Sequence, residues 1–231
     1  MSSPSPCPEC SDRDCAHRPE AMPEQSDERP VKERPILFSA PMVRAILDGR
    51  KTVTRRIVKL TEFGPSDTPG YDWHFRDRRA LWNDVSTARL VERWCHYGAP
   101  GDRLYVRETW RRSFGASKEI HYAADFDEYT RREKGPWKPG IHLPRALSRI
   151  TLEVVSVRVE RLQEITGTDA RAEGITCQAH DPMGLPCGDD CHAAVGAYAE
   201  LWDHINAERA TWESNPWVWR VEFKREEAPR G

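Results

Sequence analysis

The sequence predicts a mixed α+β fold in which strands outnumber a few short helices. Runs of alternating or β-branched apolar residues favour strands, and residues 149–162 form the longest of these runs. Segments bounded by Ser, Thr or Gly carry the capping signals of short helices. With 231 residues, 38% of them hydrophobic and 31% charged, the chain is long enough for one soluble domain with a sizeable core and a small appendage.

The predicted domain begins with a strand, a helix and a second strand. Residues 36–38 are apolar and favour a short strand, after which Ser39 is the expected helix N-cap and Gly49 the C-cap. The β-branched run that follows predicts the second strand. Because side chains alternate along a strand, three of its polar side chains share one face: Thr52, Thr54 and Arg56.

The middle of the chain is predicted to hold a long loop and several strands. Residues 63–79 are rich in Gly, Pro and Asp, which favours a loop, and residues 89–97 are interpreted as a strand. Residues 103–108 alternate clearly, and residues 121–125 predict another short strand. Glu108 falls on the apolar face of its strand, which indicates either a paired or functional carboxylate or a solvated strand end.

The C-terminal part is predicted to contain a bulged strand, two helices and a closing strand. The alternation of residues 149–162 changes phase near Val155, as it does at a β-bulge. Residues 166–174 predict a short helix that ends with Glu173, where the helix dipole disfavours a carboxylate unless a partner or solvent compensates. A core-facing helix over residues 195–209 and a strand over residues 217–224 complete the domain.

The N-terminal residues 1–33 predict a flexible tail ahead of a domain spanning residues 34–226. They are rich in Pro, Ser, Glu and Asp and contain almost no large apolar side chain. Four closely spaced side chains in this tail suit a tetrahedral zinc ion: Cys7, Cys10, Cys15 and His17. The alternative is a flexible tail with reduced cysteines.

A second group of metal-binding side chains lies in a predicted insert at residues 176–193. Its five candidate ligands are Cys177, His180, Cys187, Cys191 and His192. The two groups could hold one zinc ion each or share one ion. Neither spacing matches the catalytic zinc site of deaminases, so any zinc here is expected to be structural. No organic cofactor is expected, because the chain has no Gly-rich phosphate loop.

The net charge of −2 argues against a uniformly basic nucleic-acid coat protein. Contact with a nucleic acid would therefore need a local basic patch. The best candidate contains Arg50, Lys51, Arg55, Arg56 and Lys59, and a second contains Arg103, Arg107, Arg111 and Arg112. The sequence has neither an apolar run long enough to cross a membrane nor the core of a signal peptide, so we expect a cytoplasmic protein.

Residues 49–56 form the most informative motif. Lys51, Thr54 and Arg56 would place an amine, a hydroxyl and a guanidinium on one wall, which suits an anionic or carbonyl-bearing ligand. An ordinary basic surface strand would show the same spacing. The motif resembles the G-x-K-x-x-x-x-R motif of activating signal cointegrator homology (ASCH) domains, which belong to the PUA-like superfamily of small β-barrels that handle RNA and nucleosides.

The resemblance extends over about residues 34–224 and is closest to phage and prophage ASCH proteins of unassigned function. Its other segments are residues 34–42, 101–110, 141–145, 148–152 and 212–219. It implies a PUA-like mixed β-barrel with short flanking helices and a cleft at the corner after the first helix. If the chain is a phage product, it would act in the host cytoplasm.

The resemblance also implies site residues. Some small bacterial ASCH proteins are amidohydrolases that remove the acetyl group from N4-acetylcytidine with a Lys, a Thr three residues later and a distant Glu. Lys51 and Thr54 match the first two, Glu173 is the nearest counterpart of the third, and Glu108 is a rival. Thr54 would be the nucleophile, Lys51 its base, and Glu173 would bind an amino group or move a proton.

The favoured function is recognition of RNA, DNA or a modified nucleoside in a basic cleft, with hydrolysis of a modified nucleobase as its catalytic form. The expected substrate-binding residues are Arg50, Arg55, Arg56, Arg107, Glu108 and Trp110, of which Trp110 would stack on a base. One alternative is a ribonuclease, because other ASCH proteins resemble ribonucleases. Another is a non-catalytic phage interaction protein stabilised by zinc.

Overall fold

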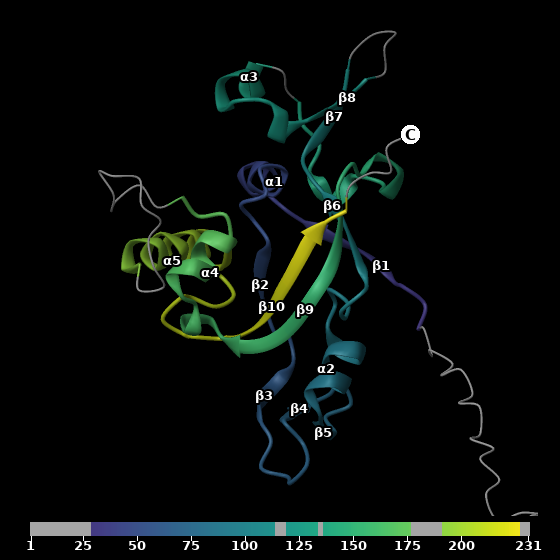
Figure 1. Ribbon diagram of the computed structural model, residues 1–231, viewed down its shortest axis with the longest axis vertical. Coiled ribbons are helices and arrows are strands. Elements are labelled where there is room, and N and C mark those ends of the chain that lie inside the picture. The colour runs from purple at the N-terminus through teal and green to yellow at the C-terminus, as the bar shows by residue number, and fades with distance from the viewer. Residues whose placement is uncertain (1–28, 114–118, 134–135, 177–190, 227–231) are drawn as a thin grey trace, which may run out of the picture. The chain divides into compact units, whose positions relative to one another are not determined.

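The computed structural model describes residues 29–113, 119–133, 136–176 and 191–226 (Figure 1). A division of the chain falls between Pro30 and Val31, and the features below belong to the second unit, Val31–Gly231. In the part of the chain that is described, no helix has the length and apolar character needed to cross a membrane.

A five-stranded sheet forms the centre of this unit, in the order β1-β6-β9-β10-β2. Its strands are β1 (Glu33–Leu37), β6 (Arg103–Arg107), β9 (Thr151–Arg161), β10 (Trp217–Arg225) and β2 (Val53–Ile57). The β1–β6 pair is parallel and the other pairs are antiparallel. The fold is therefore mixed α+β, with most of its regular structure in strands.

The predicted barrel is not closed by backbone hydrogen bonds within the described residues, because β1 and β2 are the two edges of the sheet. A side chain spans these edges instead. The guanidinium of Arg56 on β2 donates a hydrogen bond to the carbonyl oxygen of Leu37 on β1, at 2.8 Å. The same guanidinium lies 5.3 Å from the centre of the Phe38 ring.

The predicted bulge in β9 is confirmed. Along the β9–β10 ladder Ser156 pairs with Glu222, and the next pair joins Val154 to Phe223. Val155 is thus the extra residue, and its side chain is exposed, whereas Val154 is buried. The extra residue bends the strand and moves the side chains on either side of it into a new phase.

Strand β10 buries apolar side chains on both of its faces. Trp219, Val221 and Phe223 belong to one core, which also contains residues of α1 (Ala40–Leu47) and α2 (Thr87–Trp94). Val218 faces a second core with residues of α4 (Gly167–Ala172) and α5 (His192–Asn206). Figure 1 shows α4 and α5 together beside β2, and α4 is in contact with that strand. The candidate site lies at this junction.

The loop predicted at residues 63–79 is wrong. The structure has a three-stranded antiparallel sheet there, made of β3 (Thr61–Pro65), β4 (Trp73–Arg76) and β5 (Trp82–Val85). Gly64 and Pro65 belong to β3, and the other Gly, Pro and Asp residues of the segment lie between the strands. Apolar side chains join this sheet to the core, because Phe63 stacks on Trp73 at 5.0 Å and Trp73 meets the edge of Trp217 at 5.1 Å.

The strand predicted at residues 89–97 is also wrong, because most of that segment belongs to helix α2. Ser86 is the N-cap and accepts a hydrogen bond from the backbone N–H of Arg89. Leu90 and Val91 are buried, and the polar residues around them point outward with helical spacing. The capping residue and the spacing favour the helix over an extended strand.

The remaining elements are short. The predicted strand at residues 121–125 is divided between a strand and a 3₁₀ turn. The two-stranded sheet contains β7 (Trp110–Arg112) and β8 (Ile120–Tyr122), and the one further α-helix in the described residues is α3 (Glu128–Glu133). The 3₁₀ helices described are η1 (Ala123–Asp125), η2 (Gly140–His142), η3 (Arg145–Leu147) and η4 (Leu162–Glu164).

Candidate functional site

A buried ion pair joins the start of β2 to the end of α4. Lys51 lies two residues before β2, and Glu173 is the C-cap of α4. Lys51 Nζ lies 2.6 Å from Glu173 Oε2, with 0% and 4% of the two side chains exposed. The same amine donates to the carbonyl oxygens of Val53 and Glu173, both at 2.8 Å. All three protons of the ammonium therefore have acceptors, and the ammonium compensates the carboxylate at the helix C-terminus.

Burial changes the protonation behaviour of the groups around Glu173. Desolvation lowers the pKa of Lys51, and the charge of Glu173 opposes this effect. Burial also raises the pKa of Tyr198 well above its ordinary value, and the nearby Glu173 carboxylate adds to the increase. The Tyr198 hydroxyl donates a long hydrogen bond of 3.4 Å to Glu173 Oε1. Glu173 thus has a cation on one oxygen and a phenol near the other.

Arg55 on β2 is held by carboxylates on the neighbouring elements. Its guanidinium contacts Glu160 at 2.7 Å, Asp169 at 2.5 Å and Glu173 at 3.5 Å. Arg220 on β10 also contacts Asp169, at 2.9 Å. Burial would raise the pKa of Asp169, but the hydrogen bond from Arg220 and the charge of Arg55 hold that pKa below its ordinary value. This network fixes α4, and with it Glu173, against the sheet.

A pocket opens between β2, α5 and the end of α4. Its cavity volume is about 100 Å³, which is smaller than the range of about 300–1,000 Å³ that is usual for small-molecule sites, and it opens to solvent at its mouth. Its lining residues are Met42, Thr54, Arg55, Arg56, Ile57, Lys59, Tyr97, Glu173, Tyr198, Leu201, Trp202, Ile205, Asn206 and Arg209.

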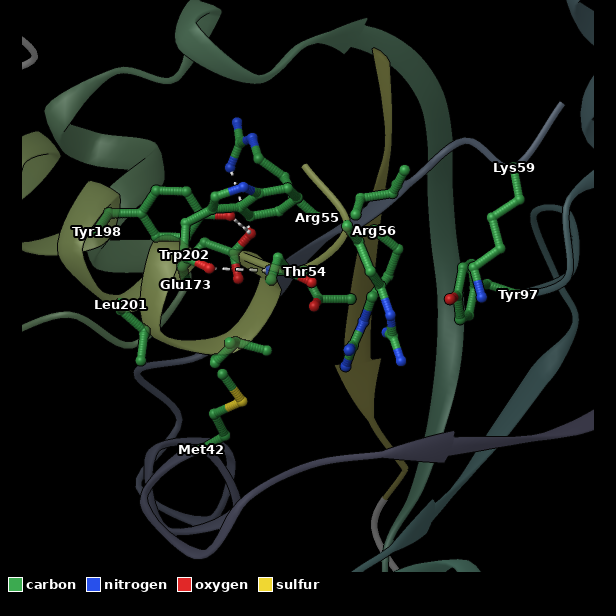
Figure 2. Close-up of a pocket in the computed structure, with 14 residues that line it drawn as sticks. Met42, Thr54, Arg55, Arg56, Lys59, Tyr97, Glu173, Tyr198, Leu201 and Trp202 are labelled. Atoms are coloured by element: carbon green, nitrogen blue, oxygen red, sulfur yellow. Dashed lines mark hydrogen bonds and ion pairs between the residues drawn. The ribbon is translucent and has the colours of Figure 1, made fainter. Parts of the chain in front are cut away.

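The pocket is lined by aromatic rings, by cations, and by the carboxylate of Glu173 and the hydroxyl of Thr54. In Figure 2, Glu173, Tyr198 and Trp202 lie on one side of the pocket, and Lys59 and Tyr97 lie on the other. The polar groups from β2 and α4 are Thr54, Arg55 and Glu173, whereas Arg56, Lys59 and Arg209 add positive charge. Such a lining can pack against a flat ring, hold an anion and place a hydroxyl beside a carboxylate.

Comparisons with protein-family models, curated proteins and solved structures find no match to this chain. The structure brings together four of the nine residues expected in the catalytic or substrate-binding site. Thr54, Arg55, Arg56 and Glu173 all line the pocket. Arg55, however, is engaged by the surrounding carboxylates, so it shapes the pocket more than it offers a free cation.

Lys51 and Arg50 are not among the lining residues. We expected Lys51 to act directly on Thr54, but its amine is bonded to Glu173 and to two backbone carbonyls. Lys51 therefore reaches the pocket through Glu173. Arg50 is exposed, pairs with Asp48 at 2.9 Å and donates to the carbonyl of Gly174 at 3.3 Å.

The other expected substrate-binding residues lie in a different cluster around β6 and β7. Arg107 donates to the carbonyl of Leu143 at 3.0 Å. Glu108 is buried against Arg149 at 2.9 Å, which confirms that it is a paired carboxylate; desolvation raises its pKa, and Arg149 opposes this effect. Trp110 is 5% exposed and does not line the pocket, so its stacking on a base stays a prediction.

The structure tests few of the predicted zinc ligands. Cys7, Cys10, Cys15, His17, Cys177, His180 and Cys187 lie outside the described residues. Cys191 is buried, carries no disulfide and is the N-cap of α5, which begins at His192. The described residues contain no group of three or more potential metal ligands. The zinc sites therefore remain predictions.

Two lining features were missed by the sequence analysis. The apolar face of α5 was interpreted wholly as core, but Leu201 and Ile205 line the pocket, and Ile205 is 46% exposed. Tyr97 comes from the segment between α2 and β6, far from β2 in the sequence. The one signal that was available is that Asn206 and Arg209 continue the apolar face of α5 with polar groups.

Proposed function

We propose that this pocket binds a nucleoside unit, either free or as part of RNA or DNA. The observation that carries the proposal is the joint lining by Tyr97, Tyr198 and Trp202 and by the cations Arg56, Lys59 and Arg209. A nucleobase needs a flat apolar surface and hydrogen-bonding groups, and its phosphate needs cations. The residues that line the pocket offer all three at one place.

The polar groups of the pocket suit the edge of a base. Thr54 can donate or accept a hydrogen bond, and the Glu173 carboxylate can accept one from an exocyclic amino group or a ring N–H. Glu173 is held by Lys51 and has little freedom to turn. A carboxylate fixed in this way discriminates bases that present a donor from bases that present only acceptors.

We also propose that the domain is of the ASCH type within the PUA-like superfamily. Two observations support this assignment beyond the mixed α+β architecture. The Lys of the motif pairs with Glu173, the residue expected as the distant Glu of the site. The side chain of Arg56, the last residue of the motif, spans the two edges of the sheet, as expected of a nearly closed barrel.

Binding is tested by isothermal titration of the full chain with nucleosides and their 5′-monophosphates. We expect saturable binding in which the monophosphate binds more tightly than the nucleoside. Arg209→Gln should remove most of that difference, and Tyr97→Leu should weaken both ligands. Arg132→Gln and Tyr129→Leu are matched controls, because both residues are exposed and lie outside the pocket. Equal loss in the controls, or no binding at all, would reject the proposal.

Hydrolysis of an acylated nucleoside is the second candidate, because Thr54 and Glu173 line the same pocket. The Thr54 hydroxyl would attack the acyl carbonyl and pass its proton to Glu173, which would then protonate the departing amine. Water would release the acyl group from Thr54 and restore the hydroxyl. In this scheme Lys51 is a positioning residue, because it acts on the substrate through Glu173.

A turnover assay separates this candidate from simple binding. The full chain is incubated with acylated nucleosides, and loss of the acyl group is followed by mass spectrometry. We expect turnover that is lost in both Thr54→Ala and Glu173→Gln and retained in Arg132→Gln. Binding without turnover would leave the chain as a recognition domain, and turnover that survives Thr54→Ala would exclude Thr54 as the nucleophile.

A further inference from the structure

Two further hollows continue from the nucleoside pocket over the small sheet and α2. The first shares Lys59 with the pocket and extends over β4 and α2, where it is lined by Arg76, Arg78, Arg79, Arg93 and His96. The second shares Arg93 with the first and is lined by Lys32, Arg34 and Arg89. We call these two hollows together the basic groove. The pocket and the first hollow thus meet at Lys59, and the two hollows of the basic groove meet at Arg93.

The cations of the basic groove are largely free to meet a ligand. Among the described residues, Lys59, Arg78, Arg79 and Arg93 are exposed and form no salt bridge. Asp77 is an acid in the first hollow, but its carboxylate accepts the backbone N–H groups of Arg79 and Leu81, at 2.8 and 3.0 Å.

The other charged groups of the basic groove reduce its positive charge only in part. Arg76 pairs with Glu62 at 3.2 Å, and both side chains are at least 40% exposed. Glu92 is the acid in the second hollow. A chain whose net charge is −2 thus gathers several exposed cations that form no salt bridge in the basic groove.

We propose that the basic groove holds the sugar-phosphate backbone of a single-stranded nucleic acid whose terminal or displaced base occupies the pocket. This inference rests on the proposed function, because it takes the pocket as the site of the base. Exposed cations that form no salt bridge suit phosphates, which they bind with release of counterions. The Arg93 guanidinium lies 5.3 Å from the centre of the Trp94 ring and presents a flat surface to a neighbouring base.

A single strand fits this surface better than a duplex. A base inside a duplex is stacked and paired, so it cannot enter a pocket without being extruded. The pocket also lies at one end of the chain of hollows, since it shares lining residues with the first hollow only. A strand that runs along the basic groove would therefore deliver one base to the pocket and its next phosphates to Lys59, Arg78 and Arg79.

The test compares mononucleotides with strands in the full chain. Fluorescence anisotropy is measured for labelled oligo(U) and oligo(dT) of about 12 nucleotides, a length typical of single-strand sites, between about 50 and 200 mM salt. The groove variant is Arg78→Gln/Arg79→Gln. Its matched control is Arg132→Gln/Arg225→Gln, two exposed arginines outside the basic groove. Mononucleotide binding is measured in parallel by titration calorimetry.

We expect the strand to bind at least about tenfold more tightly than the mononucleotide at low salt. The groove variant should lower the salt slope by about 1.4, at about 0.7 for each lost phosphate contact, and leave mononucleotide binding unchanged. A preference for oligo(U) would identify the bound strand as RNA, and a preference for oligo(dT) would identify it as DNA.

Three outcomes would overturn the groove while leaving the pocket intact: equal affinity for strand and mononucleotide, equal loss in the control variant, or equal binding of polyglutamate or of a duplex. Failure of mononucleotide binding would instead reject the pocket and the inference that rests on it.

Discussion

The ammonium of Lys51 donates a hydrogen bond from each of its three N–H groups, so this residue holds several parts of the structure in place. Lys51 fixes the carboxylate of Glu173, the backbone at the end of α4 and the backbone at the start of β2. Its aliphatic chain lies among buried groups, and its amine is 5.5 Å from the centre of the Phe38 ring. Lys51, together with Arg55 and Tyr198, sets the orientation of the Glu173 carboxylate.

Lys51→Met should therefore destabilise the domain more than a core substitution of similar volume. Removing the amine leaves the buried Glu173 carboxylate with the Arg55 guanidinium at 3.5 Å and the Tyr198 hydroxyl at 3.4 Å, and breaking a buried pair costs about 3–5 kcal/mol. Urea unfolding measures the loss. Lys51→Met/Glu173→Gln should recover most of the stability, because no charge is then left uncompensated. Equal stability of the single and double variants would show that the pair contributes little.

Cys95 should make the domain less stable at alkaline pH. Burial raises the pKa of its thiol from 9.0 to about 11. Between these values the unfolded chain releases the thiol proton and the folded chain retains it, so stability falls as pH rises. The full difference is about 2.7 kcal/mol. Urea unfolding of the wild type and of Cys95→Ala is measured from pH 8 to pH 11. The free energy of unfolding should fall less with pH in the variant, and an equal fall in both proteins would contradict the raised pKa of Cys95.

At the scale of elements, the end of α4 determines where Glu173 lies. The helix stops at Gly174, whose φ of +94° favours glycine, and a Cβ there would lie 2.9 Å from the Cβ of Ala45 and 3.4 Å from that of Lys51. The absence of a side chain at this position allows α4 to pack against α1 and the Lys51 backbone. The capping hydrogen bond from the N–H of Asp169 to Thr166 fixes the other end of the helix.

Gly174→Ala should be more destabilising than Gly49→Ala. Gly49 also has a positive φ, of +73°, but a Cβ there would meet nothing within 4 Å. Both variants carry the backbone strain of about 1–2 kcal/mol, and Gly174→Ala adds a steric clash that displaces Glu173. Urea unfolding should show a larger loss of stability for Gly174→Ala than for Gly49→Ala. Mononucleotide titration should show weaker binding for Gly174→Ala and unchanged binding for Gly49→Ala. Equal effects would mean that the close packing at Gly174 is unimportant.

The elements that were predicted correctly are those whose ends and faces are set by capping residues and by the alternation of apolar side chains. Thr166 and Gly174 mark α4, alternation marks β6 and β10, and the change of phase marks the bulge at Val155. It failed for residues 63–79, where composition resembles a loop because the turns are rich in Gly, Pro and Asp. That small sheet is anchored by aromatic contacts between distant residues, and local patterns do not encode such contacts.

At the scale of the whole domain, the site depends on contacts between distant segments. The motif around Lys51 was visible in the sequence, but its partner Glu173 lies 122 residues away and could only be chosen over Glu108 once both were placed. Tyr97 and Arg209 enter the pocket from two further segments. The position of the motif was therefore predictable, whereas the partners of Lys51 and the aromatic and cationic lining of the pocket were not.

The sheet edges should also respond to ligand binding as one unit. Arg56 lines the pocket and at the same time holds β1 to β2 through the carbonyl of Leu37, at 2.8 Å. Arg56→Met should loosen both edges and weaken binding of the phosphate. Amide hydrogen exchange would detect faster exchange in β1 and β2, with the exposed control Arg132→Gln unchanged. Exchange that is unaltered by Arg56→Met would show that other contacts hold the edges.

The most direct test of the central claim is photo-crosslinking of 5-iodouridine monophosphate to the full chain, with the modified residues located by tandem mass spectrometry. Because the claim is that the base lies among the aromatic side chains of the pocket, we predict adducts on Tyr97, Tyr198 or Trp202 that unlabelled nucleotide suppresses. Suppressible adducts found only outside the pocket, or no adduct that competitor removes, would contradict the account.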